Sequence, residues 1–190
     1  MENYPIFNAS PHSSNFILNE EMFTIFQGIK PDLTKVVKSH LKDEIWEVAK
    51  YLSTEECEKL IQFCENIGFS NSRITLPNEP NKFLRNLDRI LLSDAQTSVF
   101  LSNLLVKYLP LANEGGIFDG INKNFKFYKY EKEMMYGPHV DGESEDKERR
   151  TKSVGSIIFY LNTVEKGGLT RFISDSLNQV TFFSMVFVKN

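Results

Sequence analysis

In the first half of the chain, apolar residues recur at helical spacing in two segments. The first segment opens with the spacing of a capping box, because Ser53 can cap free backbone N–H groups while Glu56 reaches back to it. Gly68 ends it, and its apolar positions are Cys57, Leu60, Ile61, Cys64 and Ile67. The second segment opens at Ser93 and Asp94 and ends before Pro110, and its apolar stripe is Phe100, Leu101, Leu104, Leu105 and Tyr108. Two amphipathic helices are therefore predicted.

Runs rich in aromatic and β-branched residues predict strands. Ile45–Leu52 and Arg89–Leu92 are two early candidates. After Gly115–Gly116 the strand candidates follow closely, and they are Phe125–Glu131, Val154–Asn162, Leu169–Ile173 and Gln179–Lys189. Helices first and strands later are typical of an α+β domain, in which helices support a mainly antiparallel sheet.

The remaining segments give the domain organisation. We expect residues 1–42 to form a loose N-terminal segment, and Asn71–Asn81, which contains two prolines, to form a loop. Residues 43–190 then form a single domain, with helical support over 43–115 and strands over 120–190. The mixed charge run Lys147–Lys152 is expected to be a solvated loop.

Composition narrows the function classes. The net charge of −3 argues against a general nucleic-acid or anionic-membrane surface. The N-terminus has no basic region followed by an apolar stretch, and the longest mostly apolar run, Val180–Val188, is too short to span a membrane as a helix. Cys57 and Cys64 are two helical turns apart, so they are interpreted as buried thiols. We therefore expect a cytoplasmic or nuclear protein.

The most informative stretch contains His139 and Asp141. Residues i and i+2 of a strand point to the same face, so an imidazole and a carboxylate would lie side by side. This is two-thirds of a 2-His-1-carboxylate Fe(II) site. Pro138 restricts the residue before it to extended geometry, and Gly142 allows a turn directly after Asp141. The alternative is a surface pair in which Asp141 is merely the charge partner of His139.

The pair belongs to a series of motifs. Tyr130 comes first, followed by Tyr136-Gly137-Pro138-His139-Val140-Asp141. Two more motifs come later in the chain: Ile158-Phe159-Tyr160-Leu161-Asn162 and Gly167-Gly168-Leu169-Thr170-Arg171-Phe172. In this order and spacing they resemble the Fe(II)/2-oxoglutarate-dependent dioxygenases, in particular the prolyl 4-hydroxylase-like branch. The resemblance extends back to Ile45–Phe63 and to Arg85-Asn86-Leu87-Asp88-Arg89.

The resemblance implies a double-stranded β-helix, or jelly-roll barrel, with N-terminal helices packed against it. It implies that His139 and Asp141 are iron ligands, and that Tyr160 and Tyr130 line the 2-oxoglutarate site. The implied cofactors are Fe(II) and 2-oxoglutarate, with ascorbate as a further candidate. The implied reaction hydroxylates a C–H bond of a protein side chain or small molecule and releases succinate and CO2.

The chain departs from the family pattern at its end. The family has a distal histidine ligand, followed by an Arg or Lys for the 2-oxoglutarate carboxylate, but no histidine follows His139 here. The others are His12 and His40. We therefore expect an incomplete barrel whose last strand exposes an apolar edge to a partner or to self-association. The alternative function is a catalytically silent barrel that serves as a binding or scaffold module.

Overall fold

The fold was analysed in a computed structural model, which describes residues 7–8, 16–32, 34, 36–42, 45–109, 118–147, 149–171 and 183–188. The described helices are α1 (Glu21–Gln27), α2 (Thr54–Ile67) and α3 (Ala95–Leu105). The described strands are β1 (Phe7–Asn8), β2 (Ile17–Leu18), β3 (Val37–Lys42), β4 (Ile45–Ala49), β5 (Ser70–Leu76), β6 (Glu79–Ser93), β7 (Asn124–Lys129), β8 (Met135–Tyr136), β9 (His139–Val140), β10 (Glu145–Asp146), β11 (Thr151–Lys152), β12 (Gly155–Phe159) and β13 (Phe183–Val188).

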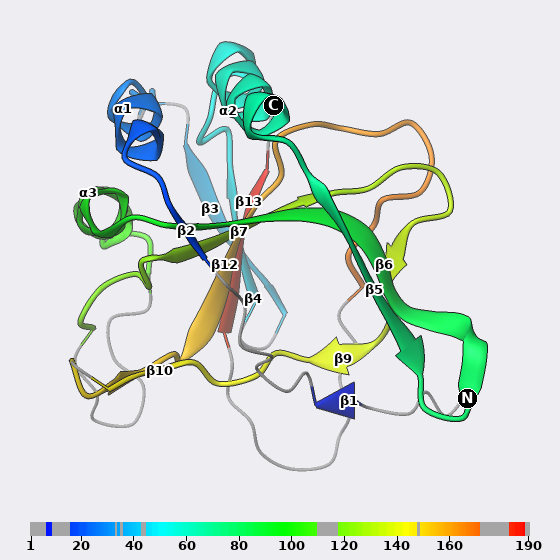
Figure 1. Cartoon of the computed structure of the whole chain (residues 1–190). Coiled ribbons are helices and arrows are strands. Elements are labelled where there is room, and N and C mark those ends of the chain that lie inside the picture. Colours follow the sequence, from blue (N-terminus) through cyan, green and yellow to red (C-terminus); the bar gives the residue numbers. More distant parts are fainter. Residues whose placement is uncertain are drawn as a thin grey trace.

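Two larger sheets form the body of the described structure (Figure 1). One has the order β12-β13-β4-β3, with β12, β13 and β4 parallel and β3 antiparallel to β4. The other is built around β6, which pairs with β5, β7 and β8 antiparallel and with β2 parallel. Two short pairs, β1-β9 and β10-β11, complete the described sheets. The predicted α+β class is confirmed, and the described strands form no closed barrel.

The three helices lie together on one side of these sheets (Figure 1). Their apolar stripes meet the inner faces of β4 and β6 in one core, because each helix and each sheet has a single apolar face to bury. The core residues are Met22, Phe26, Ile29, Val48, Tyr51, Leu52, Cys57, Leu60, Phe63, Cys64, Ile90, Leu92, Leu101, Leu105 and Leu109.

Both predicted helices are confirmed. In α2 the Ser53 Oγ accepts from the Glu56 N–H at 3.2 Å, and the Ser53 N–H donates to Glu56 Oε2 at 2.7 Å. Glu56 Oε1 also accepts from the Lys30 N–H at 2.6 Å, so the capping box ties α2 to the segment after α1. Asp94 caps α3.

The two cysteines are buried, as expected, and neither forms a disulfide. Burial, followed by the neighbouring Glu65 carboxylate, raises the pKa of the Cys64 thiol to about 12. A thiol that stays protonated is a poor nucleophile. Cys64 therefore serves as a small apolar core residue.

The prediction of a loop over Asn71–Asn81 is wrong. Residues 70–93 form the β5-β6 hairpin, with Leu76 opposite Glu79 and Asn78 at the tip with φ of +67°. The prolines suggested a loop because proline cannot donate to a strand ladder. Pro77 lies in the turn and Pro80 lies where the register shifts, so neither interrupts a regular part of the ladder.

The C-terminal strand also differs from the expectation. β13 lies between β12 and β4 and pairs with β12 over residues 183–187 and with β4 over residues 184–188, so it is an inner strand (Figure 1). The predicted exposed edge is therefore wrong for these residues. Leu169–Arg171, predicted to begin a strand, lies outside regular structure, and the rest of that prediction falls outside the described residues.

The described parts of residues 1–42 are not loose. They contribute α1, β2 along β6, and β3 along β4, and the backbone of Phe7 and Asn8 pairs with β9. Met22 and Phe26 of α1 are buried in the core. The polar composition of this segment hides the fact that its few apolar residues are used in packing.

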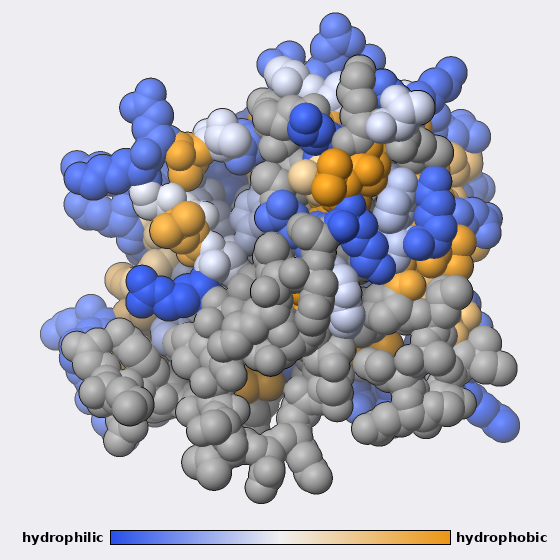
Figure 2. All heavy atoms as spheres, turned by 180° about the vertical axis from the view of Figure 1, so that it is seen from behind, coloured by the Kyte–Doolittle hydropathy of each residue, from blue (hydrophilic) through white to orange (hydrophobic). Residues whose placement is uncertain are grey.

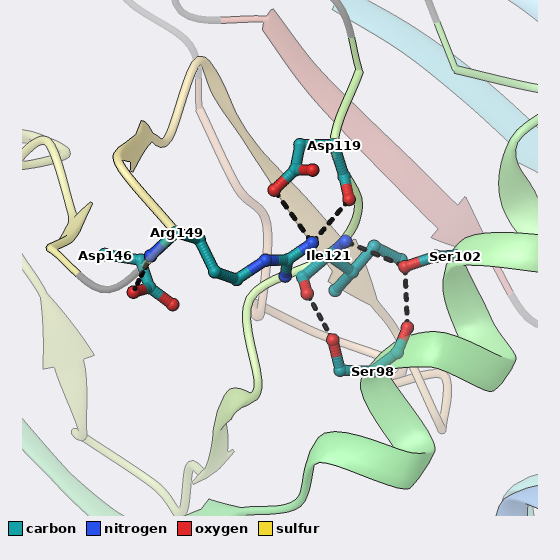
Figure 3. A network of polar contacts seen from close by, with 6 residues as sticks. All are labelled: Ser98, Ser102, Asp119, Ile121, Asp146 and Arg149. Carbon is teal, nitrogen blue, oxygen red and sulfur yellow. Dashed lines mark hydrogen bonds and ion pairs between the residues drawn. The ribbon is translucent and has the colours of Figure 1, made fainter.

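A polar network holds residues 119–121, which precede β7, against α3 (Figure 3). The Ser98 hydroxyl donates to the Ile121 carbonyl, and the Ile121 N–H donates to Ser102 Oγ at 2.8 Å. Arg149 Nη2 contacts both the carbonyl and the carboxylate of Asp119, at 2.7 and 2.8 Å. These contacts tie α3 to the turn of the β10-β11 hairpin, which is where the predicted charged loop lies.

The surface seen from behind is mixed (Figure 2). Apolar side chains reach the described part of this face in separate small groups between hydrophilic ones, as is ordinary for a folded domain. Among the described helices, none is long and apolar enough to cross a membrane.

We predict that Ser53→Ala lowers the free energy of unfolding by about 1 kcal/mol, because it removes the side-chain acceptor of the α2 capping box. Thr54→Ala at the adjacent exposed position is the matched control and should change stability much less. Chemical denaturation of the two variants measures the difference. Equal losses in both would contradict the assigned cap.

Candidate functional site

His139 is held in place by backbone contacts on both sides. The preceding β8 pairs with β6, with Tyr136 opposite Arg85, and the Gly137 N–H donates to the Leu84 carbonyl at 2.6 Å. The backbone of His139 itself pairs with Phe7 of β1. A Cβ at Gly137 would lie 3.1 Å from the Leu84 carbonyl oxygen, so a residue without a side chain suits this close approach.

The imidazole of His139 is oriented by its own chain. Nδ1 lies 2.7 Å from the Gly137 carbonyl oxygen, and since a carbonyl can only accept, Nδ1 carries the proton. Nε2 is then directed at Asp141 Oδ1, at 3.3 Å. Metal-ligating histidines are oriented in the same way, with one ring nitrogen donating to a carbonyl or carboxylate and the other free for the metal.

Asp141 is fixed by a second contact. The Ser156 hydroxyl of β12 donates to Asp141 Oδ2 at 2.6 Å, while Oδ1 faces His139. The pair is thus supported by both large sheets, because β8 rests on β6 and Ser156 belongs to the other sheet. The carboxylate side chain is 49% exposed and the imidazole 21% exposed, so the pair opens to solvent.

Each member of the pair stabilises the charged form of the other. The hydrogen bond from His139 is the largest cause of the lowered pKa of Asp141, and the Ser156 hydroxyl adds to it against the opposing effect of burial. Burial lowers the pKa of His139, but the hydrogen bonds to Asp141 and to the Gly137 carbonyl together outweigh it, so the net pKa is raised. The space between Nε2 and Oδ1 therefore favours a positive charge.

That charge can be a proton or a metal cation. Two ligand atoms bound at right angles, each about 2.1 Å from an ion, are about 3 Å apart. The 3.3 Å between Nε2 and Oδ1 is close to this value. The donor types and their separation fit two adjacent positions of a 2-His-1-carboxylate site.

The third ligand has no counterpart in the described part of the chain. No group of three or more His, Cys, Asp and Glu side chains that could hold a metal is found there. His12 and the side chain of His40 lie outside the described residues. The backbone of His40 belongs to β3, at the opposite edge of its sheet from β12.

Aromatic side chains surround the pair. The Tyr136 ring stacks on the His139 ring, with centroids 3.7 Å apart and planes within 10°. Tyr128 meets Tyr136 edge to face at 6.3 Å. Burial, followed by the neighbouring Tyr136, raises the pKa of Tyr128, and burial followed by Tyr128 raises that of Tyr130 to about 12. These phenols stay neutral at physiological pH.

The two predicted cofactor residues are neighbours of this cluster. Tyr160 is close enough to Tyr130 to contribute to its raised pKa, and the Tyr160 hydroxyl hydrogen-bonds with that of Thr170. Tyr130 is 48% exposed, so it borders the cluster and is not core. The structure thus brings Tyr130, Tyr160 and the His139–Asp141 pair to one region.

The sequence pattern did not single out Arg85 as part of this region. It is only 9% exposed, and its guanidinium lies 5.6 Å from the centroid of the Tyr136 ring. Its position follows from the pairing of β6 with β8, which could not be predicted while residues 71–81 were assigned to a loop. Ser156 and Tyr136 were part of predicted segments but were given no role. Knowledge of the strand register would have placed both Arg85 and Tyr136 beside the pair.

No protein-family model, curated protein or solved structure matches the chain.

We predict that the His139 imidazole of the metal-free protein titrates above the ordinary value of 6.5, and that Asp141→Asn brings its pKa below 6.5, because burial then acts without the carboxylate. A raised folded-state pKa adds stability below the unfolded value and loses it as the pH rises through the folded one. NMR titration of the imidazole C–H resonances measures both values. Asp119→Asn is the matched control, and a pKa unchanged by Asp141→Asn would rule out the pairing.

Proposed function

We propose that this protein is an Fe(II)- and 2-oxoglutarate-dependent oxygenase. The observation on which the proposal rests is the convergence of His139 Nε2 and Asp141 Oδ1 at 3.3 Å, with Nδ1 already occupied by the Gly137 carbonyl. The order of the motifs along the chain, from Tyr130 through His139 and Asp141 to Gly167–Gly168, agrees with this assignment. The substrate group is a C–H bond of a protein side chain or a small molecule.

His139 and Asp141 would hold the iron. Bound Fe(II) would supply the oxygen chemistry, which couples conversion of 2-oxoglutarate, with O2, to succinate and CO2 with hydroxylation of the substrate. The Gly137 carbonyl keeps the Nε2 lone pair available, and the Ser156 hydroxyl keeps Asp141 ionised and oriented. Ascorbate remains a candidate accessory reductant.

Tyr160 and Tyr130 are proposed to line the 2-oxoglutarate site. A phenol offers an apolar wall with one polar tip, which suits a short carbon chain with carboxylate ends. Tyr160 already donates to or accepts from a hydroxyl, that of Thr170. This contact keeps the ring beside the turn at Gly167–Gly168, where both glycines have positive φ, +83° and +66°.

A jelly-roll arrangement is the fold proposed for the domain. The proposal is supported by the two larger sheets, whose strands β4 and β6 contribute to one core as two sheets of an incomplete barrel would. The helices on one side agree with the buttressing expected of this family.

A second function, a catalytically silent binding or scaffold module, is favoured by one observation. The described residues supply two metal ligands and not three. In such a module the His139–Asp141 pair would hold a proton in place of a metal, and Asp141 would connect this segment to β12 through Ser156.

We predict that the metal-free protein binds one Fe(II) per chain under anaerobic conditions, more tightly with 2-oxoglutarate present, and forms succinate in air. His139→Ala removes a metal ligand and should weaken metal binding by more than about tenfold. Loss of a group that only hydrogen-bonds to a ligand already costs about 10- to 100-fold. Calorimetric titration and succinate assay measure the two effects. His40→Ala is the matched control.

The two candidate functions give different results in this titration. Metal binding that depends on His139 but not on His40 supports the oxygenase. A chain that binds neither Fe(II) nor 2-oxoglutarate, yet folds normally, would falsify the oxygenase and favour the silent module.

We also predict that Ser156→Ala weakens Fe(II) binding by roughly tenfold, because Asp141 loses the hydroxyl that orients it. Ser153→Ala is the matched control, because the Ser153 hydroxyl accepts from the Ser144 N–H and does not touch the pair. The same calorimetric titration applies. Equal effects of the two substitutions would mean that the Ser156 contact plays no part in metal binding.

A further inference from the structure

A buried arginine without a counter-ion among the described residues lies beside the candidate metal pair. Arg85 is only 9% exposed, and its Nε is fully buried without a hydrogen-bond partner. Among the described residues its side chain has no hydrogen-bond or ion-pair partner, and its guanidinium lies over the Tyr136 ring. An unpaired buried charge is unfavourable for folding, so an anion bound at this position would stabilise it.

The described neighbours of Arg85 do not supply this anion. Cross-strand pairing puts Tyr136 opposite Arg85 and Tyr128 opposite Arg89, on the next strands of the same sheet. Tyr128 and Tyr130 are neutral phenols, since burial raises the pKa of both. The carboxylate of Asp141 is engaged by His139 and Ser156.

A second arginine adds to the positive potential. Arg89 follows Arg85 by four residues on β6, so both side chains project from the same face of the strand. Burial, followed by the charge of Arg85, lowers the pKa of Arg89, because two positive charges on one face of a strand disfavour each other. An anion bound between them would relieve this repulsion.

We propose that Arg85 is the anchor of a binding site for a small carboxylic acid, beside the His139–Asp141 pair. A guanidinium binds a carboxylate through two parallel N–H···O bonds, which is the strongest charge-assisted contact available to a side chain. The Tyr136 ring connects the two parts, because Arg85 lies over it at 5.6 Å and the His139 ring stacks on it at 3.7 Å. An acid held by Arg85 would thus be separated from the candidate metal pair by the Tyr136 ring alone.

The ligand would enter along the exposed tyrosines. Tyr128 and Tyr130 are 37% and 48% exposed, and Arg85 is close enough to influence the pKa of both. Arg85 therefore stands in a region that is open on one side. The identification of the acid as 2-oxoglutarate rests on the proposed function, whereas carboxylate binding at Arg85 does not require the metal.

The experiment uses the full 190-residue chain in a chelator, so that no metal takes part. Calorimetry with 2-oxoglutarate, succinate, N-acetyl-aspartate amide and sulfate gives the affinity for each anion. Arg85→Met keeps the length and apolar stem of the side chain and should weaken carboxylate binding roughly 10- to 100-fold. Arg85→Lys, which keeps the charge but not the fork, should weaken it less.

The matched control is Arg73→Met. Arg73 lies over the Phe83 ring at 5.8 Å on the neighbouring strand β5, and it hydrogen-bonds to Asn86. It therefore shares the arginine-over-aromatic geometry but already has a partner. Its loss should leave carboxylate binding unchanged.

Thermal unfolding separates a ligand site from a structural arginine. Because Arg85→Met replaces an unpaired buried charge with an apolar chain, its Tm without ligand should equal or exceed that of the unmodified chain. Carboxylate should raise the Tm of the unmodified chain and not that of the variant. A variant that melts lower without ligand, or binds carboxylates as before, would overturn the proposal.

The anions and the metal test distinguish the remaining cases. Preference for 2-oxoglutarate identifies a cosubstrate site, preference for the amino-acid amide identifies an acidic side chain of the substrate, and equal binding of sulfate contradicts a carboxylate site. Arg85-dependent carboxylate binding without any Fe(II) binding would remove the proposed oxygenase and leave this site. Fe(II) binding at His139, together with carboxylate binding that Arg85→Met does not change, would remove this site and leave the proposed oxygenase.

Discussion

The pairing of β6 along both of its edges is the constraint on which the rest of the described structure depends. Its 15 residues hold β5 on one edge and β7 and β8 on the other, and β2 joins at its end. Ile90 and Leu92 of the same strand enter the core against the helices. The backbone of β6 also fixes Gly137 through the Leu84 carbonyl, so core packing and the orientation of His139 are set by one strand.

The arrangement of the pair explains why a cation is favoured without deciding which one. Once the Gly137 carbonyl takes the Nδ1 proton, Nε2 presents a lone pair to a carboxylate. Two electron-rich atoms at 3.3 Å are stable only with a positive charge between them or on the ring. A proton and a metal ion therefore compete for one position, and the ligands that complete the coordination sphere determine the outcome.

Local patterns predicted local structure well and long-range pairing poorly. The α2 capping box, the α3 cap and the strand at Phe125 follow from contacts within a few residues, and all three are confirmed. The β5-β6 hairpin was missed because its prolines lie at a turn and at a register shift. The inner position of β13 depends on β4, about 140 residues earlier in the chain, which no local pattern can indicate.

The candidate site follows the same division. His139 and Asp141 could be placed on one face from their spacing alone. The role of Arg85 could not, because it depends on the register that brings residue 85 opposite residue 136 across 50 intervening positions. Its buried Nε has no hydrogen-bond partner among the described residues, which is unfavourable for folding, whereas an apolar residue of similar length would avoid this cost. Proteins keep such unfavourable groups mainly at sites of binding or catalysis, where a ligand completes the contacts that folding leaves open.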